Sequence, residues 1–431
     1  MGERRIMNRL RENILILKGN LIYTKDANEF CISEDSYIVV KDNSIVGVYK
    51  SLPKEYKGVE VKDYKENLII PGFVDLHLHA SQYTLCGLGY DKTLLDWLEN
   101  YTFKEEAKFK DIEYAKKVYR DFVQELYECG TTRSVIFSSI HTKSTKLLMD
   151  LLEQKGLSAF VGKVNMNRNS PDYLIEDTMD SINETLKWVE EYKDRYKNIK
   201  PIITPRFAPS CTDELLKELG FIAKQYNLPV QSHLSENTSE VKWVKDLFPK
   251  LKGYGDVYRE YGLFGTTPTV MAHCVYLTSE EVELMKKNNV FIAHCASSNI
   301  NISSGIAPIN KLMEQGLNIG LGSDISAGDT LNMLSVISST IKASKLRALN
   351  YKDGSRQLKT SEAFYLATKG GGKFFGKVGS FEEGYEFDAL VIDDKNLWKF
   401  YNGTYEERIE KLIYVGTKNN IVARYSCGKE I

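Results

Sequence analysis

The sequence has no strong charge of either sign. Its 57 lysine and arginine residues nearly balance its 58 aspartate and glutamate residues, so the formal net charge is −1 at pH 7. The basic residues are scattered along the chain, and such a distribution creates no field that attracts nucleic acid or an anionic membrane. We therefore expect no nucleic-acid and no membrane partner, and a small or locally recognised partner instead.

Paired cysteines and long apolar runs are also missing. The seven cysteines are odd in number and widely separated, and none forms a Cys-x-x-Cys pair, which argues against a disulfide framework and against a thiolate zinc site. Near the N-terminus only residues 14–17 form an apolar run, far too short for a signal peptide or a membrane span. Together these absences predict a cytoplasmic protein.

No linker rich in proline, glycine and serine divides the chain, and no internal repeat is visible. The organisation lies in short apolar strands instead. Up to residue 69, β-type runs at 14–24, 36–42 and 44–50 are separated by Asn, Asp and Gly turns. They predict a small antiparallel sheet.

From residue 70 onward, strand-like runs alternate with helical periodicity or polar loops. The strand candidates are residues 72–79, 133–138, 159–166, 201–207, 229–236, 269–276, 290–296 and 318–324. Helical patterns lie at 112–126, 145–155, 213–226, 279–288, 329–349 and 360–375, and the long stretch between the first two strands has room for an extra helix. Eight strands alternating with helices over roughly 250 residues predict the α/β class and a (β/α)8 barrel of the TIM type.

After the last helices, residues 379–394 return to β-type alternation. If this tail completes the N-terminal sheet, the two ends of the chain build one domain. We therefore predict a small composite β-sandwich domain formed by residues 1–69 and 380–431, and a barrel domain formed by residues 70–379.

Histidine is scarce, and its placement is the strongest signal in the chain. Five of the six histidines fall near the carboxyl ends of predicted strands. Within 72–79, alternation places Asp75, His77 and His79 on one face of the strand and the aliphatic Val74 and Leu76 on the other. Because the aliphatic face of a barrel strand packs on the helices, both imidazoles should point into the barrel at its carboxyl end, where barrel enzymes do their chemistry.

The same placement recurs around the predicted rim. His233, His273 and His294 fall near the ends of the fifth, sixth and seventh strands, and Asp324 closes the eighth. Five histidines distributed at random would rarely all reach one rim, so we interpret the set as a site in which the role of His294 stays open. His141, in the loop after the second strand, lacks such neighbours and is interpreted as a structural or surface residue.

Neutral imidazoles and a carboxylate are ligands for a divalent ion such as zinc, and three or four protein ligands leave a position for water. A bound metal lowers the pKa of that water toward neutrality, which supplies a nucleophile for hydrolysis. Glu236 lies three residues after His233, close enough to exchange protons with the water and a leaving group. The pattern therefore indicates metal-assisted hydrolysis.

The motifs PGFVDLHLHA, SHLSE, AHCVYL, HCASSN and GSD resemble those of the amidohydrolase superfamily. The resemblance covers nearly the whole chain, and the continuation ASQY after the first motif is similar to the guanine deaminases within that superfamily. It implies a hydrolase of carbon–nitrogen bonds in cyclic amidines that converts guanine to xanthine and ammonia. It also implies a homodimer with one zinc ion per subunit, with Fe²⁺ as the alternative metal.

The resemblance also implies roles for individual residues. The metal ligands that it implies are His77, His79, His233 and Asp324. Glu236 would protonate the ring nitrogen and then the departing amine, Asp324 would take the proton from the attacking water, and His273 would orient that water or steady the developing charge. The fourth strand ends in TPRF, without the modified lysine with which many relatives bridge two metals, and this favours a single metal.

Substrate contact is implied for His79, Gln82, Arg206, Phe207, His233, Glu236 and Asp324. The Gln82 amide offers a donor and an acceptor to the edge of a purine, Arg206 can donate to a carbonyl oxygen, and Phe207 can stack on the ring. Without the resemblance, these last three residues are more readily interpreted as a surface glutamine, a structural ion pair and a core aromatic ring.

Two alternatives stay open. The same chemistry could act on another aminated ring, such as an adenine nucleoside, a pterin, a pyrimidine or a triazine, because HCASSN and GSDISAGDT depart from common family patterns around the pocket. The other alternative is a metal-free barrel kept as a binding or scaffold protein. Such barrels typically lose ligands, whereas all the proposed ligands and Glu236 are present here.

Overall fold

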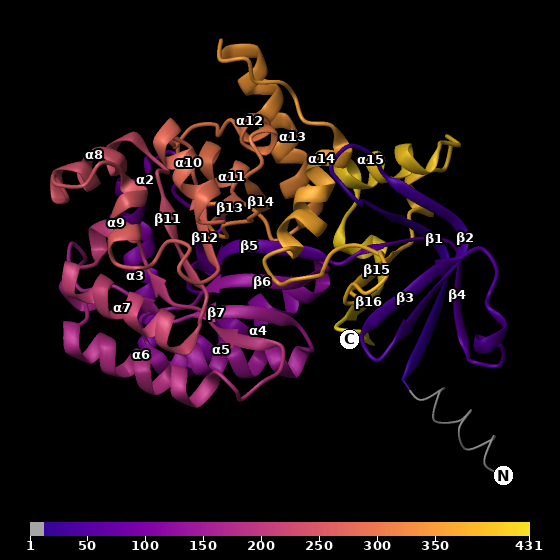
Figure 1. The fold of residues 1–431 in the computed structure, drawn as a ribbon, viewed down its shortest axis with the longest axis horizontal. Coiled ribbons are helices and arrows are strands. Elements are labelled where there is room, and N and C mark those ends of the chain that lie inside the picture. Colours follow the sequence, from indigo (N-terminus) through magenta and orange to yellow (C-terminus); the bar gives the residue numbers. More distant parts are fainter. Residues whose placement is uncertain (1–12) are drawn as a thin grey trace.

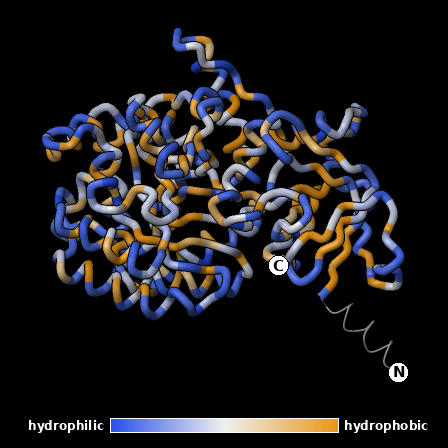
Figure 2. Tube along the Cα trace, in the orientation of Figure 1, coloured by the Kyte–Doolittle hydropathy of each residue, from blue (hydrophilic) through white to orange (hydrophobic). Residues whose placement is uncertain are grey.

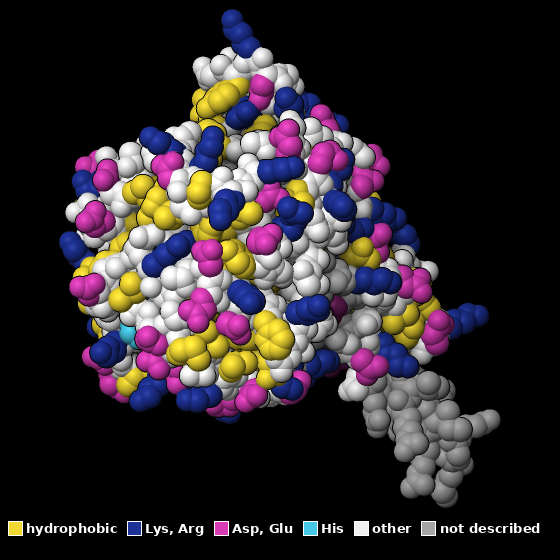
Figure 3. Space-filling view, turned by 60° about the vertical axis from the view of Figure 1, so that its left-hand side comes forward, with side chains coloured by type: hydrophobic (Ala, Val, Ile, Leu, Met, Phe, Trp, Pro, Cys, Tyr) yellow, Lys and Arg dark blue, Asp and Glu magenta, His cyan; other side chains and the backbone are white. Residues whose placement is uncertain are grey.

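The chain folds into a large body of strands and helices with a smaller sheet beside it (Figure 1). The structure is a computed structural model that describes residues 13–431, so residues 1–12 of the predicted composite domain lie outside the described part. No described helix is both long and apolar enough to cross a membrane. On the face shown in Figure 3, Lys and Arg side chains are interspersed with Asp and Glu side chains.

Eight parallel strands build the larger body. They form two four-stranded sheets, in the orders β5-β6-β7-β9 and β11-β12-β13-β14. Their bounds are β5 (Phe73–His79), β6 (Thr131–Phe137), β7 (Ser158–Gly162), β9 (Ile199–Pro201), β11 (Val230–Leu234), β12 (Thr269–His273), β13 (Phe291–His294) and β14 (Asn318–Leu321). After short breaks, β7 and β9 are followed by β8 (Val164–Asn165) and β10 (Thr204–Pro205), which pair with each other.

Hydrogen bonds on both sides close the two sheets into a barrel. On one side, Ile203 forms a bridge to Val230 at the start of β11. On the other side, the Asp324 N–H donates to the His77 carbonyl at 2.8 Å, and the His79 N–H donates to the Ile325 carbonyl at 3.1 Å. The predicted (β/α)8 barrel is therefore confirmed.

Helices follow the strands and cover the outside of the barrel (Figure 1). They are α4 (Ile112–Glu128), α5 (Thr142–Lys155), α6 (Thr178–Tyr192), α7 (Asp213–Tyr226), α8 (Thr238–Leu247), α9 (Tyr254–Glu260), α10 (Ser279–Lys287), α11 (Ala296–Asn301), α12 (Ile309–Glu314), α13 (Met333–Asn350) and α14 (Thr360–Tyr365), which runs into η7 (Leu366–Gly370). The six predicted helical ranges correspond to α4, α5, α7, α10, α13 and α14 with η7, whereas α6, α8, α9, α11 and α12 lie outside them.

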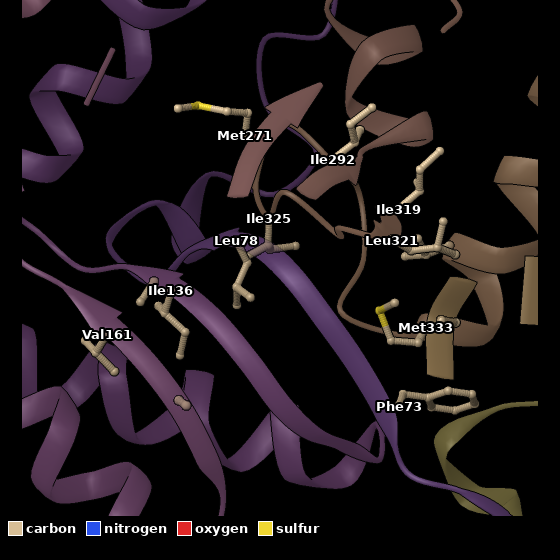
Figure 4. Close-up of a cluster of buried hydrophobic side chains, with 14 of the residues drawn as sticks. Phe73, Leu78, Ile136, Val161, Met271, Ile292, Ile319, Leu321, Ile325 and Met333 are labelled. Carbon is tan, nitrogen blue, oxygen red and sulfur yellow. The ribbon is translucent and has the colours of Figure 1, made fainter. Parts of the chain in front are cut away.

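Apolar side chains join the outer faces of the strands to these helices. Figure 4 shows Leu78, Ile136, Met271 and Ile292 in this layer, and all of them are fully buried. Figure 2 shows the corresponding pattern along the chain, with apolar strands inside and more polar helices around them. The largest hydrophobic core thus lies between the strands and the helices.

The long connection between β5 and β6 contains the extra helical segment for which the sequence has room. It consists of η2 (Ala80–Leu85), α2 (Leu94–Trp97), η3 (Leu98–Thr102) and α3 (Phe103–Ala107). Leu94 and Trp97 belong to one buried cluster with Ile302 and Ala327, which follow β13 and β14. The segment therefore covers the carboxyl end of the barrel.

The opposite end of the barrel is filled by aromatic side chains that follow η7. The Phe374 ring centroid lies 5.6 Å from that of Phe160 on β7 and 5.3 Å from that of Phe291 on β13. These two strands belong to different halves of the barrel. A side chain that touches both must lie in the interior, so this end of the barrel is closed.

Val74 and Leu76 belong to that same interior cluster, which makes one prediction wrong: they do not pack on the helices. The register between β5 and β6 breaks after Asp75. Because a shift of one residue moves every following side chain to the other face, His77 and His79 still point into the barrel although Val74 and Leu76 do so as well.

The two ends of the chain share one seven-stranded sheet, in the order β17-β16-β15-β4-β1-β2-β3. Its strands are β1 (Ile14–Tyr23), β2 (Cys31–Lys41), β3 (Ser44–Tyr49), β4 (Val61–Pro71), β15 (Ala389–Ile392), β16 (Ile421–Ser426) and β17 (Lys429–Glu430). The antiparallel pairing of β15 with β4 confirms that the tail completes the N-terminal sheet, which encloses an apolar core of its own like a small sandwich. The antiparallel sheet predicted from the runs at 14–24, 36–42 and 44–50 is confirmed by the pairs β1–β2 and β2–β3, and β4, which was not among these runs, adds a parallel pair with β1.

A buried ion pair joins this sheet to the base of the barrel. The Arg133 Nε on β6 donates to Asp388 at 2.6 Å, and the other oxygen of Asp388 accepts from the Cys427 N–H at 2.6 Å. Removing one partner of such a pair would leave a buried charge uncompensated. The domain boundaries at 69/70 and 379/380 stay a proposal, since β4 runs through the first of them.

Candidate active site

The predicted histidines and Asp324 meet at the carboxyl end of the barrel. His77 and His79 come from β5, His233 comes from β11, and Asp324 follows β14. The Nε2 atoms of His79 and His233 are 3.2 Å apart, and Asp324 Oδ1 lies 3.2 Å from His77 Nε2 and 3.6 Å from His79 Nε2. Strands from both halves of the barrel thus bring their donor atoms to one point.

These donors have the properties of metal ligands. His77 Nε2 is buried and has no hydrogen-bond partner within residues 13–431. Burial lowers the pKa of His77 and of His79 well below the ordinary histidine value, so both rings are neutral and have a lone pair to give. Ligand atoms of His77, His79 and Asp324 lie within 4.8 Å of one another, as do those of His77, His233 and His273. The buried His/Asp cluster therefore fits a divalent metal.

Neighbouring polar groups orient the side chains of the cluster. His233 Nδ1 donates to the Arg206 carbonyl at 2.6 Å, which leaves Nε2 facing the cluster. Asp75, for which the sequence predicts no separate role, accepts from the N–H of His77 at 3.2 Å and from the N–H of Ser323 at 3.0 Å through the same oxygen. One carboxylate thus joins the strand ends that carry His77 and Asp324.

Left-handed backbone turns aim two of the side chains. His273 has φ 70° and Asp324 has φ 50°, a region that costs a residue other than glycine about 1–3 kcal/mol and recurs at functional sites. By strand alternation His273 would share the outer face of β12 with Met271, which packs in the outer core. The turn at the end of β12 instead brings the His273 ring to the cluster.

Glu236 follows β11 and is buried beside the cluster. Its Oε1 accepts from the Ser304 hydroxyl at 3.0 Å, and its Oε2 lies 3.4 Å from His273 Nε2. Burial, together with the nearby Asp324 carboxylate, raises the pKa of Glu236 to about 8. This carboxyl group can therefore hold a proton near neutral pH and give it up to a basic group.

A cavity opens onto the cluster and Glu236. Its lining residues are His79, Gln82, Leu94, Trp97, Leu98, Arg206, Phe207, His233, Glu236, Glu240, His273, Ile302, Asp324 and Ala327. The helical segment after β5 supplies Gln82 and the apolar side chains that cover the cavity. The site thus combines an apolar wall with polar side chains that converge on the cluster, as small-molecule sites do.

The three predicted recognition residues all line this cavity. Gln82 is 2% exposed and is not a surface glutamine. Its Nε2 donates to Glu106 at 2.8 Å, and Arg206 Nη1 donates to the other oxygen of Glu106. The Phe207 ring faces the cavity and makes an edge contact with Trp243, with ring centroids 5.9 Å apart.

Comparison with known proteins agrees with this geometry. The amidohydrolase family model matches residues 68–431. Guanine deaminase of Dictyostelium discoideum is 37% identical to the chain over 450 residues, which cover 99% of this chain and 100% of the relative. The Homo sapiens guanine deaminase is 37% identical over 433 residues, with 96% and 92% covered. A crystal structure of guanine deaminase from C. acetobutylicum, with bound guanine in its active site, is 52% identical with a TM-score of 0.95, and the match covers 97% of this chain and 100% of that one.

The chain belongs to the guanine deaminases of the amidohydrolase family. The predicted membership, fold class and enzyme class, a hydrolase of carbon–nitrogen bonds in cyclic amidines, are confirmed by these matches. The resemblance stated from the motifs thus extends over nearly the full length of the chain. A metal-free scaffold is disfavoured, because the His/Asp cluster of this amidohydrolase is complete.

Two histidines and four other polar residues complete the account of the site. His294 ends β13 on the same face of the strand as Ile292, which packs toward the helices, and His141 precedes α5. Neither histidine belongs to the groups of possible metal-binding residues in the described part of the chain. Asp75 and Glu106 are polar residues at the site that sequence reasoning missed, as are Ser304, which donates to Glu236, and Glu240, which lines the cavity. Asp75 sits in the histidine motif itself, which is a signal, whereas Glu106 lies in the charged run FKEEAKFK, which resembles an exposed helix face.

Proposed function

We propose that this protein hydrolyses the 2-amino group of guanine and releases xanthine and ammonia. The observation that carries the proposal is that one cavity brings together the His/Asp cluster, Glu236 and the polar side chains of Gln82 and Arg206. The C. acetobutylicum protein, which is 52% identical, has guanine bound in its active site. The other aminated rings stay as the alternative, because the chain alone does not name the ring.

We propose His77, His79, His233 and Asp324 as the ligands of one zinc ion, with Fe²⁺ as the alternative. The unpartnered Nε2 of His77, the neutral rings of His79 and His233 and the Asp324 carboxylate oxygen support this set. When bound, the metal lowers the pKa of a water molecule and so supplies a nucleophile near neutral pH. His273 lies close to the same point, and we assign it to orienting the water and not to binding the metal.

The remaining steps fall to side chains of this chain. Asp324 accepts a proton from the water as the water oxygen forms a bond to C2 of guanine. The Oδ2 atom of Asp324 lies 3.9 Å from His273 Nε2. Glu236 gives its proton to N3, the ring nitrogen next to C2 that carries no hydrogen, then takes up the proton that remains on the new C2 hydroxyl and passes it to the 2-amino group as the C2–N bond breaks and ammonia leaves. The proton that Asp324 took from the water then returns to Glu236 and restores both groups. Water and guanine thus become xanthine and ammonia without any further reactant.

The remaining substrate contacts are proposed from the cavity lining. His79 and His233 border the ring near the cluster, and Phe207 offers a face for stacking. Gln82 and Arg206 form hydrogen bonds to the polar N1–C6 edge of guanine, which adjoins C2. Together with Glu236 and Asp324, these residues make up the proposed substrate site.

An assay of zinc-loaded protein tests this function directly. Incubation with guanine should release xanthine and ammonia in equal amounts, measured by the ultraviolet spectrum of the purine and by an ammonia-coupled assay. Adenosine, a pterin, a pyrimidine and a triazine serve as the comparison panel. Release of ammonia from one of these rings but not from guanine would replace guanine as the substrate.

A homodimer and a cytoplasmic location stay predictions from the sequence and its family resemblance. We expect the purified protein to sediment with the mass of two chains in analytical ultracentrifugation at micromolar concentration. A species with the mass of one chain under these conditions would contradict the dimer. It would leave the proposed reaction untouched, because all the site residues named above come from one chain.

A further inference from the structure

A second buried carboxylate lies behind the polar wall of the cavity. Glu106, on α3, is 2% exposed and does not itself line the cavity. Both of its oxygens are engaged by residues that do: Oε1 accepts from Gln82 Nε2 at 2.8 Å, and Oε2 accepts from Arg206 Nη1. Glu106 therefore holds two recognition residues at once, from η2 and from the chain after β10.

Glu106 decides which end of the Gln82 amide faces the cavity. A carboxylate accepts hydrogen bonds and cannot donate them, so the Gln82 NH₂ group must point toward Glu106. The carbonyl oxygen of the amide then points away from Glu106. Among the described residues nothing donates to this oxygen, and Gln82 lines the cavity. The wall thus presents a hydrogen-bond acceptor at Gln82.

Arg206 supplies the opposite polarity beside it. A guanidinium has five N–H donors and no acceptor, and within residues 13–431 only Nη1 is used, by Glu106. The group is 3% exposed and lies over the Phe103 ring, 5.2 Å from its centroid, which limits its movement. Because one carboxylate holds both side chains, the acceptor of Gln82 and the free donors of Arg206 lie side by side.

We propose that Glu106 is a positioning residue that sets substrate specificity: by orienting Gln82 and Arg206 it makes the cavity select a lactam edge. A lactam edge is a ring N–H next to a C=O, and it matches an acceptor next to a donor. An amidine edge is a bare ring nitrogen next to an amino group. It places an acceptor against the Gln82 oxygen and a donor against the Arg206 guanidinium, so neither hydrogen bond forms. The proposal rests on the proposed function, since guanine carries its lactam edge next to the reacting C2.

The substrate pair that tests this polarity is guanine and 2,6-diaminopurine. Both carry the 2-amino group that is hydrolysed, but 2,6-diaminopurine replaces the lactam edge with an amidine edge. A site built to hydrogen-bond one edge rejects an analogue that cannot make those bonds by factors of about 1,000 or more. The wild-type enzyme should therefore show a kcat/KM for guanine at least about 1,000-fold above that for 2,6-diaminopurine.

Glu106→Gln removes the charge that orients both side chains and keeps the size of the side chain. A glutamine at this position can donate as well as accept, so the Gln82 amide is free to turn over, and Arg206 loses its ion pair. We expect kcat/KM for guanine to fall about 100-fold, while kcat/KM for 2,6-diaminopurine changes by less than about threefold. The ratio between the two substrates, and not activity alone, is the readout, because a structural defect would lower both values together.

Glu105→Gln is the matched control. Glu105 is the preceding buried carboxylate of α3 and accepts from Thr84 at 2.6 Å and from Lys108 at 2.6 Å, with no contact to Gln82 or Arg206. This control should keep the wild-type ratio. A ratio that stays at the wild-type value in Glu106→Gln, or that falls equally in Glu105→Gln, would overturn the proposal.

The wild-type measurement decides the question if Glu106→Gln does not fold, since it needs no variant. A wild-type enzyme that accepts 2,6-diaminopurine within about tenfold of guanine would refute a lactam-selective wall. Failure of the proposed function has a different signature, because the wild-type enzyme would then release no xanthine from guanine. A wild-type enzyme that deaminates guanine but accepts 2,6-diaminopurine almost equally well would refute only the role of Glu106.

Discussion

Replacing Glu236 by glutamine is expected to lower kcat for guanine deamination by about 1,000-fold, within the range that general acid–base catalysis contributes. The carboxyl group at this position holds a proton because burial raises its pKa to about 8, and the reaction needs that proton first on the ring nitrogen and then on the amine. An amide keeps the shape and the contact to Ser304 but can neither release nor take up a proton near neutral pH. Steady-state and single-turnover rates of xanthine formation measure the effect.

Metal content separates this loss from damage to the cluster. Glu236 is not a proposed ligand, so Glu236→Gln should bind as much zinc as the wild-type protein, as measured by elemental analysis. Glu281→Gln is the matched control, because Glu281 is also a buried carboxylate but accepts from the backbone N–H groups of Gly255 and Thr278 away from the cavity. A zinc-loaded Glu236→Gln variant that retains kcat within about tenfold of the wild type would contradict the proton-shuttle role.

Local patterns in the sequence predict most of the barrel. Each of the eight apolar runs corresponds to one buried strand of the barrel. Each strand can be located from its own run, without information from the rest of the chain. The predicted helix at 213–226 coincides with α7, because Thr212 accepts from the Leu215 N–H at its start and Asn227, with φ 50°, ends it. Capping residues alone do not suffice, because α6 and α8 lie outside the predicted ranges although Asp177 caps the first and Asn237 forms a capping box with Glu240 at the second.

Strand alternation predicts the histidine site only in part. It places His77 and His79 correctly in the interior, but the break in register after Asp75 puts Val74 and Leu76 there too. For His273, alternation alone indicates the wrong face, and the left-handed turn at the end of β12 corrects it. Both effects are backbone irregularities that a regular period of two residues cannot express.

Contacts between distant segments account for what the sequence hides. Glu106 binds Arg206, which is 100 residues further along the chain, and no local feature of FKEEAKFK distinguishes this glutamate from its neighbour Glu105. Both are buried, whereas a charged helical run is usually solvated. The role of Glu106 becomes visible only when the barrel brings α3 over the end of β10.

Loss of one histidine ligand is the second large effect that we expect. Removing a group that merely orients a ligand costs about 10- to 100-fold in metal affinity, so His77→Ala, which removes a proposed ligand outright, should lose more than about 100-fold. The wild-type protein should contain about one equivalent of zinc per chain after reconstitution and dialysis, and the variant almost none, with xanthine formation lost in parallel. His141→Ala is the control, because this histidine lies outside the cluster in the described structure and its loss should leave zinc content and rate unchanged. Retention of a full equivalent of zinc by His77→Ala would contradict the proposed ligand set.

In contrast to Glu236→Gln, which should bind zinc and fail in the proton transfers, His77→Ala should fail because the metal is absent. The two variants together separate metal binding from proton transfer.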